Sequence, residues 1–390
     1  MRPKAGTLER AGPFRQFVLK LASRCNLACD YCYVYAGPDQ TWRSQPRVMS
    51  AATISAVSER IGAHMRAHEL DNVQIGLHGG EPLLAGTSTL EDVIASVRAA
   101  APRSARVDLA IQTNGVLLDE AFLVLFARHR VRVGISLDGT RQANDRHRLR
   151  ADRRASHDDV TRALRLLGTV SYRGLFAGLL CTIDLANDPV ETYRALLEFG
   201  PPTVDFLLPH GNWSRPPPRP PGASGTAYAD WLIAIFDRWY AAPGAGTRIR
   251  LFDEVIHLLL GGSPATETIG GGIAGFAVVE TDGAIEGADS LKSAYHGAAG
   301  TGLTVAANSF DEALAHPVIA AQQLGRAGLC ATCRSCPVVG VCGGGQYAHR
   351  YRAGLGFGHP SVYCTDLQRL IEHIARRVHA DLDRARGRHP

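Results

Sequence analysis

Three cysteines with the spacing of a redox centre lie close together near the start of the chain, at Cys25, Cys29 and Cys32. Three thiolates placed this closely can bind three irons of a cubane [4Fe–4S] cluster, which leaves the fourth iron open to a small molecule. Structural zinc is the alternative, but zinc takes four ligands in a closed tetrahedron, and the first histidine of the chain is His64. The spacing therefore predicts an iron–sulfur centre after the apolar run Phe17–Leu21.

A second group of five cysteines lies near the C-terminus, and five thiols can complete one four-ligand site but not two. A zinc knuckle is the alternative here as well. Lone Cys181 lies in an apolar run and is expected to be a buried small hydrophobe. Tight grouping favours metal binding over disulfides, and reduced cysteines indicate a reducing, cytoplasmic location. The second group consists of Cys330, Cys333, Cys336, Cys342 and Cys364.

The composition excludes several classes of protein. Of the 390 residues, 45% are hydrophobic and 20% are charged, which is typical of a globular chain and not of a disordered one. No apolar run is long enough to cross a membrane, and the N-terminal residues lack the apolar segment of a signal peptide. The net charge of +5 is modest and its basic residues are scattered, so we expect neither a nucleic acid nor a membrane as partner.

Short β-rich runs alternate with amphipathic helical stretches from residue 14 to about 211. Six such βα repeats imply parallel strands joined by crossover helices, in a barrel or in an open doubly wound sheet. The predicted strands are Phe14–Ala22, Val73–His78, Arg106–Gln112, Val131–Leu137, Leu175–Ile183 and Val204–Pro209. The predicted helices between them are Ala51–His68, Thr89–Ala100, Glu120–Arg128, Asp158–Leu167 and Val190–Phe199, and later ones are Ala227–Tyr240, Phe252–Leu260 and Leu367–Leu382.

Polar residues follow three of the predicted strands where the strands end. The second strand ends in Gly79–Pro82, whose glycines allow close backbone approach and whose carboxylate can accept from an ammonium group. The third and fourth end in Gln112–Gly115 and Ser136–Gly139. Turn formation explains the Asn-Gly and Asp-Gly pairs but not the other polar residues, so we expect ligand contacts at these tips. The loop Asn144–Arg148 follows, and Arg146 is either a contact to substrate or cofactor or part of a solvated charge run.

The Cys-x₃-Cys-x₂-Cys motif, with Tyr31 before its last cysteine, resembles the radical S-adenosylmethionine (SAM) enzymes. The resemblance implies a partial (β/α)6 TIM-type barrel with its site at the C-terminal ends of the strands. It also implies that SAM binds the open iron and is cleaved to a 5′-deoxyadenosyl radical. Tyr31 would then pack on the adenine of SAM, and Glu81 would hold its amino group. The cofactor-binding residues implied are Tyr31, Gly79, Gly80, Glu81, Thr113, Asn114, Ser136 and Asp138.

The distal cysteines resemble the SPASM extension, the auxiliary-cluster domain of radical SAM peptide maturases. In that pattern Gln346 replaces one cysteine, and residues 262–329 contain none of the other ligands of a further cluster. The resemblance therefore implies one auxiliary [4Fe–4S] cluster, with Cys330 as a spare or alternative ligand. Asp289 follows Ala288, which stands where the family has a cluster cysteine, and the resemblance makes Asp289 a general base if burial raises its pKa. The implied ligands are Cys333, Cys336, Cys342 and Cys364.

The expected domain organisation follows from these assignments. We expect an N-terminal extension over 1–13, the barrel over 14–214, a linker with bridging helices over 215–264, a smaller SPASM-like domain over 265–366 and a C-terminal helix over 367–390. The run Arg215–Gly222 is proline-rich, and because proline lacks an amide donor and has a fixed φ we interpret it as a semi-rigid spacer.

Further motifs resemble the FxsB-like, cyclophane-forming branch of these maturases. They are Tyr33–Tyr35, Asp39–Arg43, Cys342–Tyr351 and Pro360–Cys364. The resemblance implies a ribosomally made precursor peptide as substrate and a reducing partner such as flavodoxin or ferredoxin. The implied product is a carbon–carbon link from an aromatic ring to the β-carbon of a nearby residue. The alternatives are a thioether or ether link, oxidation of a sulfatase-type residue, or an iron–sulfur peptide-binding protein without catalysis.

Overall fold

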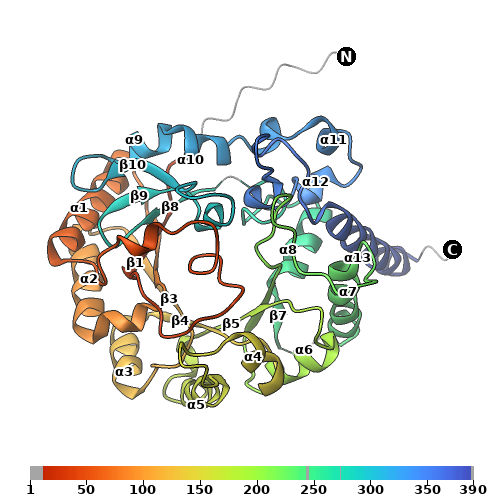
Figure 1. The fold of residues 1–390 in the computed structure, drawn as a ribbon, viewed down its shortest axis with the longest axis horizontal. Coiled ribbons are helices and arrows are strands. Elements are labelled where there is room, and N and C mark those ends of the chain that lie inside the picture. The colour runs from red at the N-terminus through yellow and green to blue at the C-terminus, as the bar shows by residue number, and fades with distance from the viewer. Residues whose placement is uncertain (1–11, 243–245, 273, 388–390) are drawn as a thin grey trace.

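One ten-stranded sheet runs through the computed structural model, which describes residues 12–242, 246–272 and 274–387 (Figure 1). Its strand order is β10-β9-β8-β1-β2-β3-β4-β5-β6-β7. The strands from β8 through β1 to β7 are parallel to their neighbours, whereas β8, β9 and β10 form antiparallel pairs. The sheet curves into an incomplete barrel with helices on its outside, so the predicted α/β partial barrel is confirmed.

The six predicted strands are present with bounds that differ by a few residues. They pair in chain order, because each crossover helix returns the chain to the same edge of the growing sheet. The strands are β1 (Gln16–Ala22), β2 (Asn72–Gly79), β3 (Arg106–Thr113), β4 (Arg132–Ser136), β5 (Phe176–Thr182), β6 (Thr203–Leu207), β7 (Arg248–Ile249), β8 (Phe276–Val279), β9 (Ala284–Glu286) and β10 (Gly300–Thr304).

The predicted helices are also present, and side-chain caps begin several of them. Ser50 Oγ accepts from the Thr53 amide at the start of α1, and Asp119 does the same for α3. The α-helices are α1 (Ala51–Ala67), α2 (Gly86–Ala100), α3 (Glu120–His129), α4 (Arg141–His147), α5 (His157–Leu167), α6 (Pro189–Leu197), α7 (Ala227–Tyr240), α8 (Arg250–Leu259), α9 (Phe310–Ala315), α10 (Pro317–Gln322), α11 (Ala331–Arg334), α12 (Val339–Cys342) and α13 (Cys364–Ala385). Short 3₁₀ helices include η2 (Pro82–Ala85), η4 (Asp289–Ser293) and η6 (Tyr347–Arg350).

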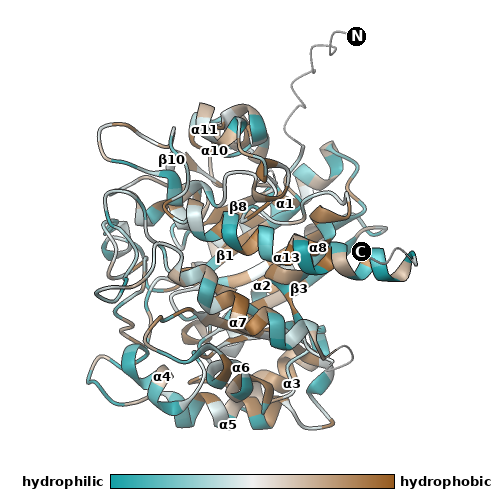
Figure 2. Cartoon of the chain, turned by 90° about the vertical axis from the view of Figure 1, so that its right-hand side faces the viewer, coloured by the Kyte–Doolittle hydropathy of each residue, from teal (hydrophilic) through white to brown (hydrophobic). Residues whose placement is uncertain are grey.

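The C-terminal third of the chain is joined to the barrel at two places. Strand β8 extends the sheet by pairing with β1, and α13 packs against α7 and α8 on the opposite side. Hydrophobic and hydrophilic residues alternate along these helices, with the apolar positions turned to the core (Figure 2). An ion pair of Arg369 with Asp230 and a hydrogen bond between His373 and Asp237 fasten the outer edge of α13 to α7.

The two ends of the chain lie outside the described residues, and one helix forms where a loop was expected. Residues 1–11 of the predicted N-terminal extension and 388–390 of the predicted C-terminal segment lie outside the described residues. Helix α4 forms over the charged stretch that the sequence suggested to be a loop, because Thr140 caps it by accepting from the Ala143 amide. Among the helices of the described ranges, none has the length and apolar character required to span a bilayer.

Close packing of α1 on α2 makes a fold-level prediction at Gly62. A Cβ at this position would lie 2.2 Å from the Ala100 carbonyl oxygen, so Gly62→Ala must push the two helices apart. Alanine favours a helix by about 1 kcal/mol over glycine, but overpacking costs about 1–3 kcal/mol. We therefore expect Gly62→Ala to lower the midpoint of thermal unfolding. Gly174→Ala, where no heavy atom lies within 4 Å of the new Cβ, is the matched control, and equal midpoints for the two variants would contradict this packing.

Candidate active site

The cysteine loop crosses the mouth of the barrel between β1 and α1 (Figure 1). Its backbone is held from two sides. The Ala28 amide donates to the Leu149 carbonyl at 2.7 Å, after α4, and the Arg24 carbonyl accepts from the Glu81 amide at 3.0 Å, after β2. These bonds place Cys25, Cys29 and Cys32 at the C-terminal ends of the strands, where parallel barrels carry their chemistry.

The three thiols are too far apart to surround a single ion. All three are partly buried and free of disulfides. Four thiolates around one zinc, with Zn–S bonds of about 2.3 Å, would lie about 3.8 Å apart. Within the described part of the chain, neither cysteine group brings three sulfur atoms within 4.8 Å of one another. Burial raises the pKa of Cys25 to about 12 and that of Cys29 to about 11, so the thiolates depend on the positive charge of bound iron.

Glu81 is the centre of the hydrogen bonds at the strand ends. Its side chain is fully buried, and its carboxylate accepts from Thr113 Oγ1 at 2.7 Å, from the Asn114 amide at 2.8 Å and from the Leu83 amide at 3.0 Å. Burial is the largest influence on the Glu81 pKa and raises it, while the three hydrogen bonds act against the rise. Glu81 therefore ties β2 to β3.

The two glycines before Glu81 allow this strand end to approach the cysteine loop. A Cβ at Gly80 would lie 1.8 Å from the Tyr35 hydroxyl oxygen, and one at Gly79 would lie 2.3 Å from the Ala22 carbonyl oxygen. Gly79 also has a φ of +154°. The backbone at Gly79 and Gly80 therefore approaches the end of β1 and the cysteine loop closely, as glycine allows.

Tyr31 is anchored to the tip of β4. Its hydroxyl donates to Asp138 Oδ2 at 2.5 Å and accepts from Arg148 Nη1 at 2.8 Å, while Asp138 Oδ1 accepts from the Thr182 amide at 2.9 Å. The Tyr31 ring lies 5.7 Å from the ring of His147. The buried guanidinium of Arg148 thus holds the cysteine loop and the ends of β4 and β5 in one arrangement.

Arg148, and not Arg146, reaches the cysteine loop. The guanidinium of Arg146 is engaged by Asp184 and by Asn187 Oδ1, the latter at 2.8 Å, after β5. Arg148 is only 7% exposed and lies near Cys29, where its charge lowers the thiol pKa against the effect of burial. The two arginines are two positions apart at the end of α4, and only the tertiary fold decides which one points inward.

The remaining predicted contacts are at the expected edge and also make bonds within the protein. Asn114 Nδ2 donates to Asn26 Oδ1 at 2.8 Å and lies 3.6 Å from Cys25 Sγ. Ser136 Oγ accepts from Gln112 Nε2 at 3.0 Å. Asn114 therefore supports the cysteine loop, as Glu81 and Asp138 do. It also lies at the strand ends where the sequence predicted contacts to SAM.

A cavity of about 460 Å³ opens beside the cysteine loop. The proline-rich segment 215–220 forms one wall, so it lines the site besides joining two parts of the chain. Tyr228 fixes this wall by donating from its hydroxyl to the Pro218 carbonyl at 2.6 Å, and Arg219 pairs with Asp366 at 2.5 Å. Other lining residues are Tyr31, Cys32, Tyr33, Asp184, His210 and Ser293.

Asp289 lies in a buried network of charges next to this cavity. Lys20, on β1, forms an ion pair with it, and Lys292 Nζ lies 3.6 Å from its other oxygen. Lys292 also pairs with Glu280 and, at 2.8 Å, with Glu286. Tyr33 and His210, which line the cavity, are close enough to Asp289 for its charge to affect their pKa.

The expectation that burial raises the Asp289 pKa is wrong. Burial is the largest single influence and acts upward, but Lys20, Lys292 and His78 together outweigh it and hold the pKa of the carboxyl well below its ordinary value. Asp289 is therefore ionised, as a proton acceptor must be, but it is a weak base. The sequence did not show the pair with Lys20, which is 269 positions from Asp289 in the chain, whereas Lys292 lies three positions after Asp289 in η4.

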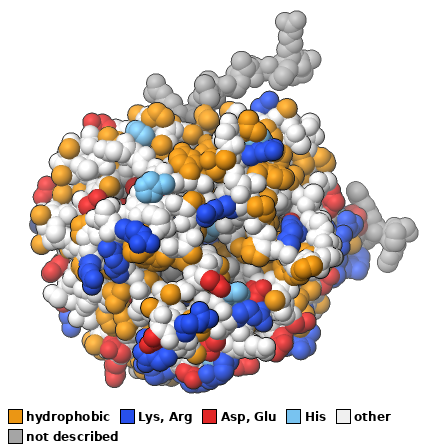
Figure 3. Space-filling model, viewed as in Figure 1, with side chains coloured by type: hydrophobic (Ala, Val, Ile, Leu, Met, Phe, Trp, Pro, Cys, Tyr) orange, Lys and Arg blue, Asp and Glu red, His pale blue; other side chains and the backbone are white. Residues whose placement is uncertain are grey.

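Four of the five distal cysteines line one cavity of about 220 Å³. Cys330 is not among them, although its thiol lies against Cys333 and raises the pKa of that thiol, after burial. Hydrophobic side chains gather over this C-terminal region on the face shown in Figure 3. The four that meet are Cys333, Cys336, Cys342 and Cys364, the same four that the sequence suggested as ligands of an auxiliary cluster.

Comparison with known proteins agrees with this geometry. Residues 19–198 match the Radical SAM superfamily. This part of the chain has the radical SAM α/β fold. The cysteine-type anaerobic sulfatase-maturating enzyme of Clostridium novyi is 27% identical over 272 residues, which are 68% of this chain and 70% of that enzyme. The serine-type anaerobic sulfatase-maturating enzyme of Klebsiella aerogenes is 27% identical over 352 residues, 88% of this chain and 82% of that enzyme.

Solved structures share the fold. Native anSMEcpe with bound AdoMet has a TM-score of 0.81 at 20% identity and covers 95% of this chain and 99% of its own. Streptococcus suis SuiB bound to precursor peptide SuiA has a TM-score of 0.60 at 10% identity, and the match covers 91% of this chain and 76% of that chain. The predicted cofactors, a SAM-binding [4Fe–4S] cluster and one auxiliary [4Fe–4S] cluster, agree with the radical SAM assignment. The cyclophane branch stays a prediction.

Sequence reasoning missed three cationic residues of the site, namely Arg148, Lys20 and Lys292. A signal for the lysines was present. The chain has only three lysines, and one of them, Lys20, interrupts the apolar run of the first strand. A charged residue in a buried strand requires a partner of opposite charge, so this position alone indicated a buried ion pair.

Loss of a thiol from the first group is expected to abolish SAM cleavage, because three cysteines are the minimum that leaves one iron open. Cys25→Ala, Cys29→Ala and Cys32→Ala should each form no 5′-deoxyadenosine from SAM after anaerobic reconstitution and reduction. Cys181→Ala, which removes a buried thiol of β5 outside both groups, is the matched control. Wild-type yields of 5′-deoxyadenosine from any of the three variants would contradict the assignment of the loop.

Loss of a thiol from the second group is expected to spare SAM cleavage. The wild-type protein should hold about eight irons per chain, and Cys333→Ala, Cys336→Ala or Cys342→Ala should retain about four. These variants still form 5′-deoxyadenosine but modify substrate poorly. The test measures the iron content and the yield of 5′-deoxyadenosine of the wild type and of each variant. About twelve irons in the wild type, or zinc in the distal site, would count against a single auxiliary cluster.

Proposed function

We propose that the protein is a radical SAM enzyme that modifies a ribosomally synthesised precursor peptide. The product is a cyclophane, in which an aromatic ring is joined to the β-carbon of a nearby residue. The cavity of about 460 Å³ carries the proposal, because its walls include Cys32 of the cysteine loop and also Tyr33 and His210, whose pKa values the charge of Asp289 raises. The cysteine loop thus faces a space that has room for a side chain of a peptide, and Asp289 belongs to the charge network behind the Tyr33 and His210 wall.

The chemistry divides between the cofactor and the chain. When bound, SAM and its cluster supply the one-electron chemistry that generates the 5′-deoxyadenosyl radical. The substrate gives up a β-hydrogen atom to that radical, and the resulting β-carbon radical bonds to the ring. The ring then loses one proton and one electron to become aromatic again. The four thiols around the distal cavity supply the site for a one-electron acceptor.

Asp289 takes the ring proton in this proposal. A ring carbon that has become tetrahedral carries an acidic proton, because loss of that proton restores aromaticity. An ionised carboxylate with a low pKa is therefore a sufficient acceptor. Lys20 and Lys292 keep Asp289 ionised, and the bond from Lys20 holds one of its oxygens, so the lysines act by positioning and not by raising basicity.

Oxidation of a cysteine or serine side chain is the second candidate. The similarity to cysteine-type and serine-type sulfatase-maturating enzymes over 68% and 88% of this chain favours it. The motifs Tyr33–Tyr35 and Cys342–Tyr351, which resemble the cyclophane-forming branch, favour the crosslink. Gln346 and Ala288 stand where the SPASM resemblance expects cysteines of a further cluster. Around Ala288 the chain instead has the Lys292 network with Glu280 and Glu286.

The product distinguishes the two candidates. With a candidate precursor peptide as substrate, chosen from any short reading frame found beside this gene, we expect a product that has lost two hydrogens and that resists backbone fragmentation between the linked residues. Serine oxidation also removes two hydrogens, so mass alone does not decide. Treatment with hydroxylamine, which reacts with an aldehyde and not with a carbon–carbon link, completes the test. A hydroxylamine-reactive product without a macrocycle would replace the crosslink by side-chain oxidation.

Asp289→Asn tests the proton acceptor. We expect 5′-deoxyadenosine to form as in the wild type, while the yield of crosslinked peptide falls by a factor of about 10² or more, because the amide cannot accept the ring proton. Unpairing buried Lys20 costs about 3–5 kcal/mol, so iron content and thermal unfolding must show that the variant is folded. Asp282→Asn, which changes an exposed residue in the turn between β8 and β9, is the control. Normal crosslinking by folded Asp289→Asn would make Asp289 a purely structural residue.

A further inference from the structure

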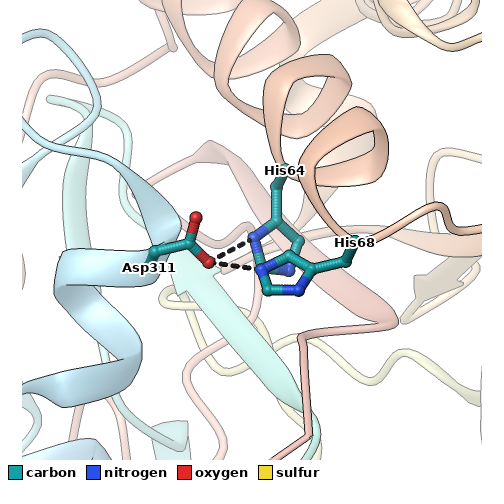
Figure 4. A group of neighbouring side chains, drawn as sticks. All are labelled: His64, His68 and Asp311. Carbon is teal, nitrogen blue, oxygen red and sulfur yellow. Dashed lines mark hydrogen bonds and ion pairs between the residues drawn. The ribbon is translucent and has the colours of Figure 1, made fainter.

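Two histidines and one aspartate meet away from the candidate active site (Figure 4). His64 and His68 are four positions apart on α1, so they lie on the same face of the helix one turn apart. Asp311 belongs to α9, 243 positions from His68 in the sequence, and points at both rings. The fold therefore brings together three side chains that are common ligands of transition metals.

The three ligand atoms have the separations of a mononuclear site. His68 Nε2 lies 2.6 Å and His64 Nδ1 lies 3.1 Å from the same oxygen, Asp311 Oδ1. All three atoms lie within 4.8 Å of one another. Nitrogen and oxygen ligands at about 2.0–2.1 Å around a tetrahedral zinc are about 3.3 Å apart. Small rotations of the partly exposed His68 and Asp311 side chains would open the group to that spacing.

His64 supplies an independent reason to expect a ligand. Its side chain is 1% exposed, and among the described residues neither ring nitrogen has a hydrogen-bond partner. A buried polar atom without a partner costs about 1–3 kcal/mol. Contact with Asp311 Oδ1 at 3.1 Å lacks the angle of a hydrogen bond, whereas a metal between the three atoms would satisfy Nδ1.

The surroundings fix His64 and leave a way in for an ion. Its ring packs against Phe14, Phe17 and Phe310, with ring centres 5.9, 5.9 and 6.1 Å away, so its orientation is set by apolar contacts. His68 and Asp311 are 32% and 49% exposed on the other side of the group. One rigid buried ligand with two accessible ones gives an ion both a fixed direction and an entry path.

We propose that His64, His68 and Asp311 bind a divalent transition-metal ion, with zinc as the best match, and that the ion fastens α9 to α1. Two imidazoles and a carboxylate suit zinc, with water as its fourth ligand. Phe14 and Phe17 lie at the start of β1 and the cysteine loop follows its end, so the seven-residue strand separates the two sites by about 20 Å. The site is therefore structural and independent of the radical chemistry.

The test uses the iron-loaded protein, so that its cysteines are occupied. After incubation with zinc and removal of the excess, elemental analysis should find about one zinc per chain in the wild type and none in His68→Gln or Asp311→Asn, with equal iron in all three. Zinc should raise the unfolding midpoint of the wild type only. His373→Gln, which removes a histidine paired with a single carboxylate, is the matched control and should behave as the wild type.

Asp311→His separates a metal site from a simple hydrogen-bonded group. Three imidazoles still bind zinc, so this variant should keep the ion and the shift in the unfolding midpoint, although it loses the carboxylate. Cobalt added to the iron-loaded wild type should give weak visible bands in the difference spectrum, without the intense near-ultraviolet absorption of cobalt–thiolate bonds. The proposal is overturned if the wild type takes up no zinc, if His68→Gln takes up as much, or if Asp311→His takes up none.

Discussion

The buried carboxylate of Glu81 is the interaction on which the mouth of the barrel depends. A charged group without partners would be too costly at a position with no exposure, and each hydrogen bond to it contributes about 1.5–3 kcal/mol. Its partners come from the end of β3 and from the turn after β2. Because the Glu81 amide also holds the Arg24 carbonyl, the same residue sets the height of the cysteine loop above the sheet.

A second buried charge network connects the barrel to the C-terminal third of the chain. Lys20 comes from β1, whereas Asp289 and Lys292 come from η4, which follows the β8–β9 hairpin. Strand β8 pairs with β1 in parallel, and this register delivers η4 to the barrel mouth. The network is satisfied only when both parts of the chain are in place, so the carboxylate beside the cavity is a product of the complete sheet.

Polar and charged side chains fill the region around Gln346 and Ala288, where the sequence resemblance predicted cysteines. Gln346 bonds to Glu267, whose pKa is raised to about 7 by burial, and Lys292 takes the carboxylates of Glu280 and Glu286. Buried polar groups of this kind are tolerated only when they are paired. Polar and charged side chains therefore occupy this region, and the four distal thiols that line one cavity lie apart from it.

Much of this protein could be predicted from the sequence alone. The period of its apolar residues predicted six parallel strands and their helices, because burial on both faces of a sheet is a local property of each segment. The spacing of Cys25, Cys29 and Cys32 indicated the cluster for the same reason, since all three lie in one loop. The tertiary structure decided that Arg148 and not Arg146 turns inward, and that Lys20 depresses the pKa of Asp289. It also brought Asp311 to His64 and His68. These outcomes depend on contacts between residues far apart in the chain, and a contact of that kind leaves no periodic trace in either segment.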